Sequence, residues 1–201
     1  IFLFIFILLT ACSDDVENQN ELESLLKSKD PIVLLANAKE KQRIGAYEDA
    51  VQILKAAVKI DPKLISAYNQ MGLIYFEADK KNQSVDAFKK AISIDPENLN
   101  SRLGLGKTYS MITRNDLAVE QYLKAANIKP NDADIYFMIA LEYWYHQNLE
   151  KAKEYYNKVL VIDPNNIQTH LNLISVYESL EDWKKAIIEI EISRKLGKEK
   201  K

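Results

Sequence analysis

The sequence contains one cysteine, two histidines, five glycines and five prolines among its 201 residues. A single cysteine excludes a disulfide within the chain, and the two histidines, His146 and His170, form no metal-ligand cluster in the sequence. No glycine-rich stretch typical of a phosphate-binding loop is present. The formal net charge is −2, so no basic field indicates nucleic acid as a partner. We therefore expect no enzyme activity, no metal and no cofactor.

The few prolines are not scattered. Four of them, Pro62, Pro96, Pro130 and Pro164, follow one another at equal intervals along the sequence. An isoleucine stands two residues before each, and the position directly before each proline is disfavoured in an α-helix. This period predicts a repeated unit that ends at each proline, and the low glycine content favours helices in between.

The period divides the chain into blocks at residues 31–64, 65–98, 99–132, 133–166 and 167–200. Each block is expected to hold two antiparallel helices, A and then B. Small residues recur at the eighth and twentieth positions, where the two helices would approach closely. A large apolar residue recurs at the twenty-fourth position of each block: Leu54, Phe88, Tyr122, Tyr156 and Ile190.

Both the period and the pattern resemble the tetratricopeptide repeat over residues 31–197, most closely in the second to fourth blocks. The first block departs from it at Lys41, and the fifth at Ile174 and Ser193. The resemblance implies an all-α, right-handed superhelical solenoid of about five repeats that binds proteins and lacks catalytic residues.

The N-terminus is different in composition. Residues 1–11 are almost wholly apolar but too few to span a bilayer, which needs about 20 residues. They are typical of the apolar part of a secretory signal whose charged start is missing from the sequence. The segment Leu9-Thr10-Ala11-Cys12 resembles the lipobox of bacterial lipoproteins. We expect lipidation at Cys12, the alternative being a chance cysteine after an apolar run.

Residues 12–30 are expected to form the lipidated cysteine and an acidic tether, unstructured over residues 13–20. The spacing of Leu22, Leu25 and Leu26 predicts a short helix that caps the first repeat. The residue after Cys12 is Ser13 and not aspartate, which at this position would resemble an inner-membrane retention signal. We therefore expect an outer-membrane anchor facing the periplasm. Surface display is the alternative, because residues 12–15 resemble export signals of some surface lipoproteins.

The resemblance implies that the A helices line a concave groove and that the second, fifth, ninth and twelfth positions of each block face it. The groove then combines apolar anchors with polar groups suited to an extended or helical peptide. The alternative is that the apolar residues pack between neighbouring A helices. The predicted binding residues are Asn69, Leu73, Phe76, Asn100, Leu103, Phe137, Leu141 and Trp144.

The last B helix is apolar on two sides. Ile188 and Ile192 occupy positions that hold an acid and a lysine in the second to fourth blocks, so both are expected to point outward. Ile187 and Ile190 are expected to face inward. The outward pair predicts docking of a partner or a second copy, with the basic tail at residues 198–201 at its rim. The alternatives are two scattered exposed isoleucines, or a small rotation of the helix that buries them.

These features predict a lipid-anchored scaffold for protein–protein interaction in the bacterial envelope. In plan it is similar to the tetratricopeptide pilotins of type IV pilus assembly, which escort a secretin to the outer membrane. A second hypothesis is an adaptor that docks peptidoglycan hydrolases or proteases to the membrane.

Overall fold

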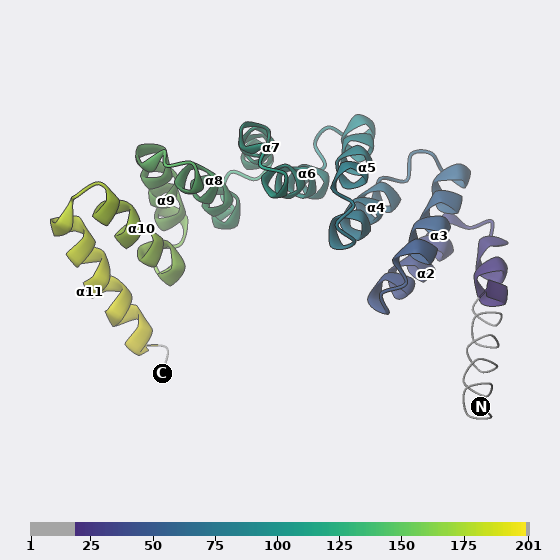
Figure 1. Ribbon diagram of the computed structural model, residues 1–201, viewed down its shortest axis with the longest axis horizontal. Helices are drawn as coiled ribbons and strands as arrows, with labels where there is room; N and C mark the ends of the chain where they lie inside the picture. Colours follow the sequence, from purple (N-terminus) through teal and green to yellow (C-terminus); the bar gives the residue numbers. More distant parts are fainter. Residues whose placement is uncertain (1–18, 200–201) are drawn as a thin grey trace, which may run out of the picture. The chain divides into compact units, whose positions relative to one another are not determined.

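The computed structural model describes residues 19–199, and these residues form helices joined by short turns, without a strand (Figure 1). The predicted lipidation site, Cys12, and the end of the basic tail lie outside the described residues. A short helix at residues 19–26 comes first. The other helices are α2 (Pro31–Arg43), α3 (Tyr47–Ile60), α4 (Ile65–Glu77), α5 (Lys81–Ile94), α6 (Leu99–Met111), α7 (Asn115–Ile128), α8 (Ala133–Tyr145), α9 (Leu149–Ile162), α10 (Ile167–Ser179) and α11 (Trp183–Glu199).

The helices keep the period of the prolines. From α2 onward, the A helices begin at the same interval that separates the prolines, and the B helices do the same. The predicted stops are also found. Asp61, Asp95 and Asp163 cap the ends of their B helices in extended or near-extended conformations. At the start of α2, the Asp30 carboxylate accepts a hydrogen bond of 2.8 Å from the Ile32 amide, with Pro31 in the first turn.

The turns between A and B helices share one backbone geometry. A residue with positive φ occurs at the same position of every such turn: Gly45, Asp79, Thr113, Gln147 and Glu181. Only the first is a glycine, which takes this conformation without steric cost. The four others show that the geometry is set by the packing of the helix pair rather than by local preference.

The chain divides into two compact units, one ending at Gly104 and the other beginning at Leu105, so the residues of α6 belong to both. In the first unit, α2 packs on α3 and α4 on α5, around a buried apolar core that includes Leu34, Ile53 and Ile74. In the second unit, α8 packs on α9 and α10 on α11, around Tyr156, Leu173 and Val176. All six side chains are essentially inaccessible to solvent.

Large and small residues interlock as the repeat pattern predicted. The Phe88 ring lies against both Gly72 and Gly104, where an added Cβ would stand 2.7 and 2.3 Å from ring carbons. The Tyr122 ring lies against Gly106 in the same manner, at 2.4 Å. These distances are shorter than any van der Waals contact, so the glycines are required by the rings beside them.

The expected tether needs one correction. Residues 19 and 20 were expected to be unstructured, but they belong to the helix at residues 19–26. The predicted leucines, Leu22, Leu25 and Leu26, pack against the core of the first unit, and the Lys41 ammonium contacts the Glu21 carboxylate at 2.7 Å. Apolar burial and this ion pair stabilise a helix that is too short to persist alone. At the other end, α11 continues to Glu199, so residues 198 and 199 are helical rather than a separate tail.

Candidate functional site: the A-helix surfaces

In the first unit, the predicted binding residues on α4 and the start of α6 are accessible to different degrees. Leu73 is 44 % exposed, whereas Phe76 and Leu103 are half-buried and Asn100 is exposed. Burial of such an exposed apolar side chain by a partner would be favourable, because its surface would be removed from water. Leu73 and Phe76, three residues apart on α4, therefore form an apolar strip on one side of that helix.

Asn69 is partly committed within the chain. Its amide nitrogen donates to the Asn98 side-chain oxygen at 3.1 Å, and its own oxygen accepts a bond of 2.6 Å from the Ser101 hydroxyl. The Asn98 oxygen also accepts from the backbone amide of Ser101 at 3.1 Å. This network ties α4 to the start of α6. Asn69 can offer a partner only its remaining hydrogen-bonding capacity.

In the second unit, Phe137, Leu141 and Trp144 on α8 are half-buried and pack against the core of that unit. The Phe137 ring meets the buried Tyr156 ring edge-on, with centroids 5.7 Å apart. Two alternatives were predicted for these residues, partner binding in the groove and packing within the chain. Each residue fits both in part, since one side lies in the core and the other in water. They are weaker candidates for pure binding residues than Leu73.

Two exposed residues of the second unit extend this surface. Tyr145, the last residue of α8, is 65 % exposed, and its ring contacts Trp144 edge-on at 5.0 Å. Leu171 on α10 is 44 % exposed and occupies the fifth position of its block, one of the positions assigned to the groove. The repeat pattern indicated Leu171. It gave no signal for Tyr145, which lies at a thirteenth position.

A stack of aromatic rings covers one side of the fourth repeat. The Tyr155 ring lies between those of Tyr143 and Tyr136, with centroids 5.6 and 6.4 Å away. The Lys158 ammonium stands 4.1 Å from the Tyr155 centroid and is also bonded to Glu154 at 2.8 Å. Burial raises the pKa of Tyr155, and the hydrogen bond with Glu154 raises the pKa of Lys158. This arrangement stabilises the packing of α8 on α9 and holds the lysine positively charged.

The prediction for α11 was partly wrong. Ile188 is 46 % exposed as expected, but Ile192 is half-buried. Ile187 was expected to face inward and is instead 56 % exposed, while Ile190 is half-buried. The reason is that the inward direction was taken from internal repeats, in which a following helix covers that position. Within the described residues no further helix follows α11.

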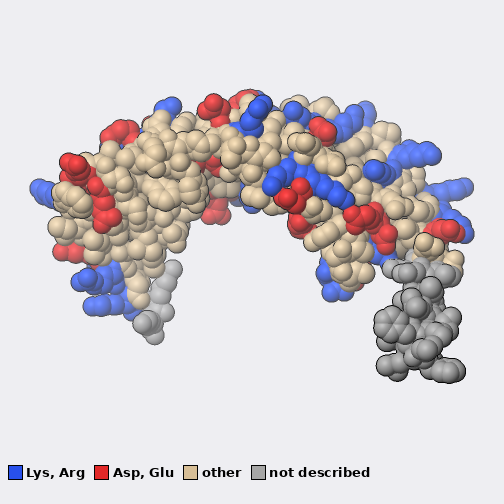
Figure 2. Space-filling view, in the orientation of Figure 1, with Lys and Arg blue, Asp and Glu red and all other residues tan. Residues whose placement is uncertain are grey.

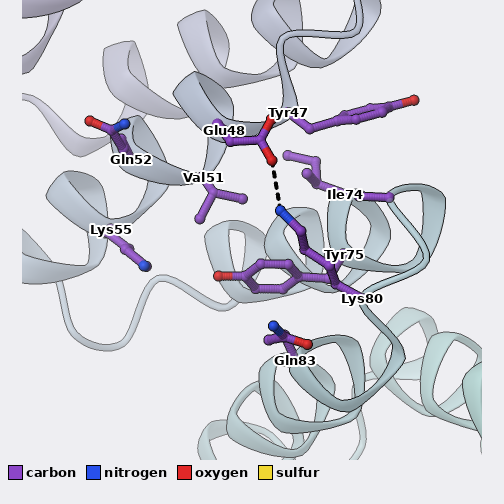
Figure 3. A pocket seen from close by; sticks show the side chains of 10 residues that line it. Tyr47, Glu48, Val51, Gln52, Lys55, Ile74, Tyr75, Lys80 and Gln83 are labelled. Carbon is purple, nitrogen blue, oxygen red and sulfur yellow. Dashed lines mark hydrogen bonds and ion pairs between the residues drawn. The ribbon is translucent and has the colours of Figure 1, made fainter.

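A pocket of the first unit lies between α3, α4 and α5 and has a volume of about 300 Å³ (Figure 3). Val51 and Ile74 contribute apolar walls, and the Lys80 ammonium reaches across to the Glu48 carboxylate at 2.6 Å. The hydrogen bond with Lys80 lowers the pKa of Glu48.

A second pocket, of about 430 Å³, lies in the other unit. Each of its lining residues stands two repeats after a residue that lines the first pocket, from Tyr47 and Asn115 to Gln83 and Lys151. The same crevice therefore occurs at two equivalent junctions between repeats. The side chains that line the two pockets differ, so the pockets share a position in the repeat but not a binding chemistry.

In the described part of the chain, His, Cys, Asp and Glu form no group of three or more able to hold a metal ion. His170 is buried between α10 and α11. One ring nitrogen lies 2.5 Å from the Glu189 carboxylate and the other 3.0 Å from the Pro164 carbonyl. The contact with Glu189 joins α10 to α11, and the contact with Pro164 joins α10 to the turn before it. No helix within residues 19–199 has the length and hydropathy needed to cross a membrane.

Comparison with known proteins agrees with the repeat assignment. Residues 43–79 match a family described as TPR repeat, and residues 65–98 and 133–166 match the tetratricopeptide repeat. No curated protein matches the chain.

Several solved structures share the fold. A crystal structure of MamA is 22 % identical and superposes with a TM-score of 0.76, covering 81 % of this chain and 95 % of MamA. MamA from Desulfovibrio magneticus RS-1, also 22 % identical, has a TM-score of 0.77 and covers 87 % and 98 %. YrrB, described as a TPR protein with an unusual peptide-binding site, is 20 % identical, with a TM-score of 0.71 and coverage of 89 % and 91 %. Residues 19–199 thus have the all-helical repeat fold of these structures, and two stretches of the sequence, residues 43–98 and 133–166, match models of the tetratricopeptide repeat.

Proposed function

We propose that this chain is a lipid-anchored scaffold of the bacterial envelope that binds a protein partner through its A helices. The observation that supports this most strongly is the accessible apolar strip of α4, in which Leu73 is 44 % exposed and Phe76 is half-buried, with half-buried Leu103 at a groove position of α6. Exposed apolar residues flanked by polar groups are typical of peptide-binding surfaces. Asn100 and Lys39 are exposed polar residues at the second and ninth positions of their blocks, both of which are assigned to the groove.

The anchor is proposed from the sequence. An apolar segment at residues 1–11, two small residues and the only cysteine of the chain coincide at Cys12. More than one acyl chain on that residue would hold the repeats firmly at a bilayer, since one chain alone binds marginally. We place the anchor in the outer membrane, with the repeats in the periplasm.

The partner, in this proposal, belongs to a larger envelope assembly such as a type IV pilus or secretin system. The support is the plan of the chain, in which a lipobox, an acidic segment and tetratricopeptide repeats follow one another as in pilotins of that system. A partner of this kind would be held near the membrane while its complex forms.

The test of the anchor is Cys12→Ser, with Ser13→Ala as the matched control. The wild type and the control should partition with membranes and take up a labelled fatty acid, whereas Cys12→Ser should lose both properties. Equal membrane partitioning and equal labelling of Cys12→Ser would contradict the anchor. The partner-binding part is tested separately, by the crosslinking experiment at Leu73 described in the Discussion.

A further inference from the structure

The last helix, α11, presents a row of side chains that we call the end face: Trp183, Ile187 and Ile190. Trp183 is 60 % exposed, Ile187 is 56 % exposed and Ile190 is half-buried. Their spacing of four and three residues places them on one side of the helix. Three large apolar residues on one accessible stripe are more than the single exposed apolar side chains found on most surfaces.

The same positions are covered in the earlier repeats. The residues equivalent to Ile187 include Val51, Val85 and Val119, which are only 8 to 9 % exposed. The fourth equivalent, Lys153, is half-buried. All four residues equivalent to Ile190 are at most 2 % exposed: Leu54, Phe88, Tyr122 and Tyr156. The end face is therefore one half of an interface that recurs inside the chain.

The other half of that interface is the A helix of the following repeat. Phe88 of α5 lies against Gly104 of α6, and the Tyr156 hydroxyl of α9 accepts a hydrogen bond of 3.0 Å from Asn172 of α10. On α10, the side facing the preceding repeat carries Thr169, Leu173 and Val176, all fully buried. A helix that covers the end face should likewise carry a small or β-branched residue at i and aliphatic residues at i+4 and i+7.

The charges on α11 indicate which kind of helix could bind the end face. Lys184 lies at the start of the helix, and Arg194, Lys195 and Lys198 lie near its end, all exposed. Figure 2 shows basic side chains gathered at this end of α11. Of the acids between them, Glu189 is bonded to His170, which leaves Glu191 as the exposed one. A second copy of α11 would place like charges against one another, whereas acidic residues at the ends of a partner helix would be attracted.

We propose that the end face binds an amphipathic helix of a partner protein, with the i, i+4, i+7 apolar pattern of an A helix and acidic residues at both ends. This surface is separate from the A-helix surfaces of the proposed function. It would bury Ile187 as its valine equivalents are buried, and it would cover Trp183, whose equivalents in the earlier repeats are half-buried.

The probe is a side-chain-crosslinked helical peptide that copies residues 167–179 and carries two added glutamates at each end. Calorimetry with the full chain in mild detergent should detect its binding. Ile187→Glu should weaken this binding by at least about tenfold, as expected for loss of a central apolar contact. The matched control is Val161→Glu, which changes an 83 % exposed residue of α9 and should leave affinity unchanged. A probe with lysines in place of the added glutamates should bind at least about tenfold more weakly.

Several outcomes would overturn the proposal: no binding of the acidic probe, equal affinity for Ile187→Glu, or equal affinity of the lysine probe. Loss of binding on Leu73→Glu would assign the probe to the A-helix surface instead. A dimer in analytical ultracentrifugation that Ile187→Glu dissociates would assign the end face to a second copy. Because Ile187 is already exposed, circular dichroism of Ile187→Glu should match that of the wild type. If the variant has lost helicity, its weaker binding reflects misfolding and does not support the proposal.

Discussion

Single residues in this chain are determined by their neighbours in adjacent repeats as much as by their own helix. Gly72 and Gly106 could be predicted, because small residues recur at the eighth position of the repeat pattern. Gly104, at the sixth position, could not, because only the structure shows the Phe88 ring lying between two glycines. Ile187 was wrongly predicted to face inward for a related reason. Its valine equivalents in the earlier repeats are buried by the helix of the next repeat, and no such helix follows α11 within the described residues.

Gly104 provides a test of this interlocking. A Cβ at position 104 would overlap the Phe88 ring, so Gly104→Ala should lower the free energy of unfolding by about 1–3 kcal/mol despite its better helix propensity. Gly197, on α11, has nothing within 4 Å of its added Cβ. Gly197→Ala should therefore raise stability by about 0.5–1 kcal/mol. Urea unfolding measures both changes, and a gain of stability in both variants would show that the Phe88 contact is not tight.

Tyr156 should make the chain sensitive to alkali. Burial of its hydroxyl raises the pKa of Tyr156 from 10.0 to about 12, because the phenolate would lose its water. The neutral phenol is thus favoured by folding. Its contribution to stability is complete below pH 10 and is lost as the pH rises through about 12.

Urea unfolding of Tyr156→Phe at a series of pH values checks this expectation. The variant should lose less stability than the wild type between pH 10 and 12, because it has no proton to release. At neutral pH it should be less stable by about 1 kcal/mol, since the hydrogen bond from Asn172 is lost. Parallel pH profiles for the two proteins would contradict the assignment.

Helices and turns were the most predictable level. The prolines gave the period, and every A and B helix from α2 to α10 ends within the block assigned to it. The turn geometry was less predictable. Only Gly45 is a residue type that adopts positive φ freely, whereas Asp79, Thr113, Gln147 and Glu181 adopt it because both flanking helices are held by packing.

The helix at residues 19–26 tests how far packing stabilises a short element. Because it is too short to be stable in isolation, its order depends on Leu22, Leu25 and Leu26. Leu25→Ser combined with Leu26→Ser should speed amide hydrogen exchange in α2 and leave α8 to α11 unchanged. Lys27→Ser, at an exposed position, is the control. Unchanged exchange in α2 would mean that this helix does not stabilise the first repeat.

At the scale of the whole molecule, the repeat architecture could be predicted almost completely, whereas the exposure of the proposed binding residues could not. The groove positions came from the repeat pattern, which cannot say how deeply a particular side chain is buried. Leu73 is well exposed, whereas Phe137 and Trp144 are half-buried against the core of the second unit. Substitution of either aromatic residue is therefore expected to lower stability, so a weaker binding of such a variant would not isolate a contact with the partner.

The central claim, that the A-helix surface captures a protein partner at the membrane, is tested most directly by photocrosslinking in cells. A benzophenone amino acid at position 73 should give discrete adducts that remain with the membrane fraction. The same amino acid at position 161, which is 83 % exposed on the B helix α9, should not give these adducts. Identical adduct patterns at positions 73 and 161, or no adduct at position 73, would contradict the claim.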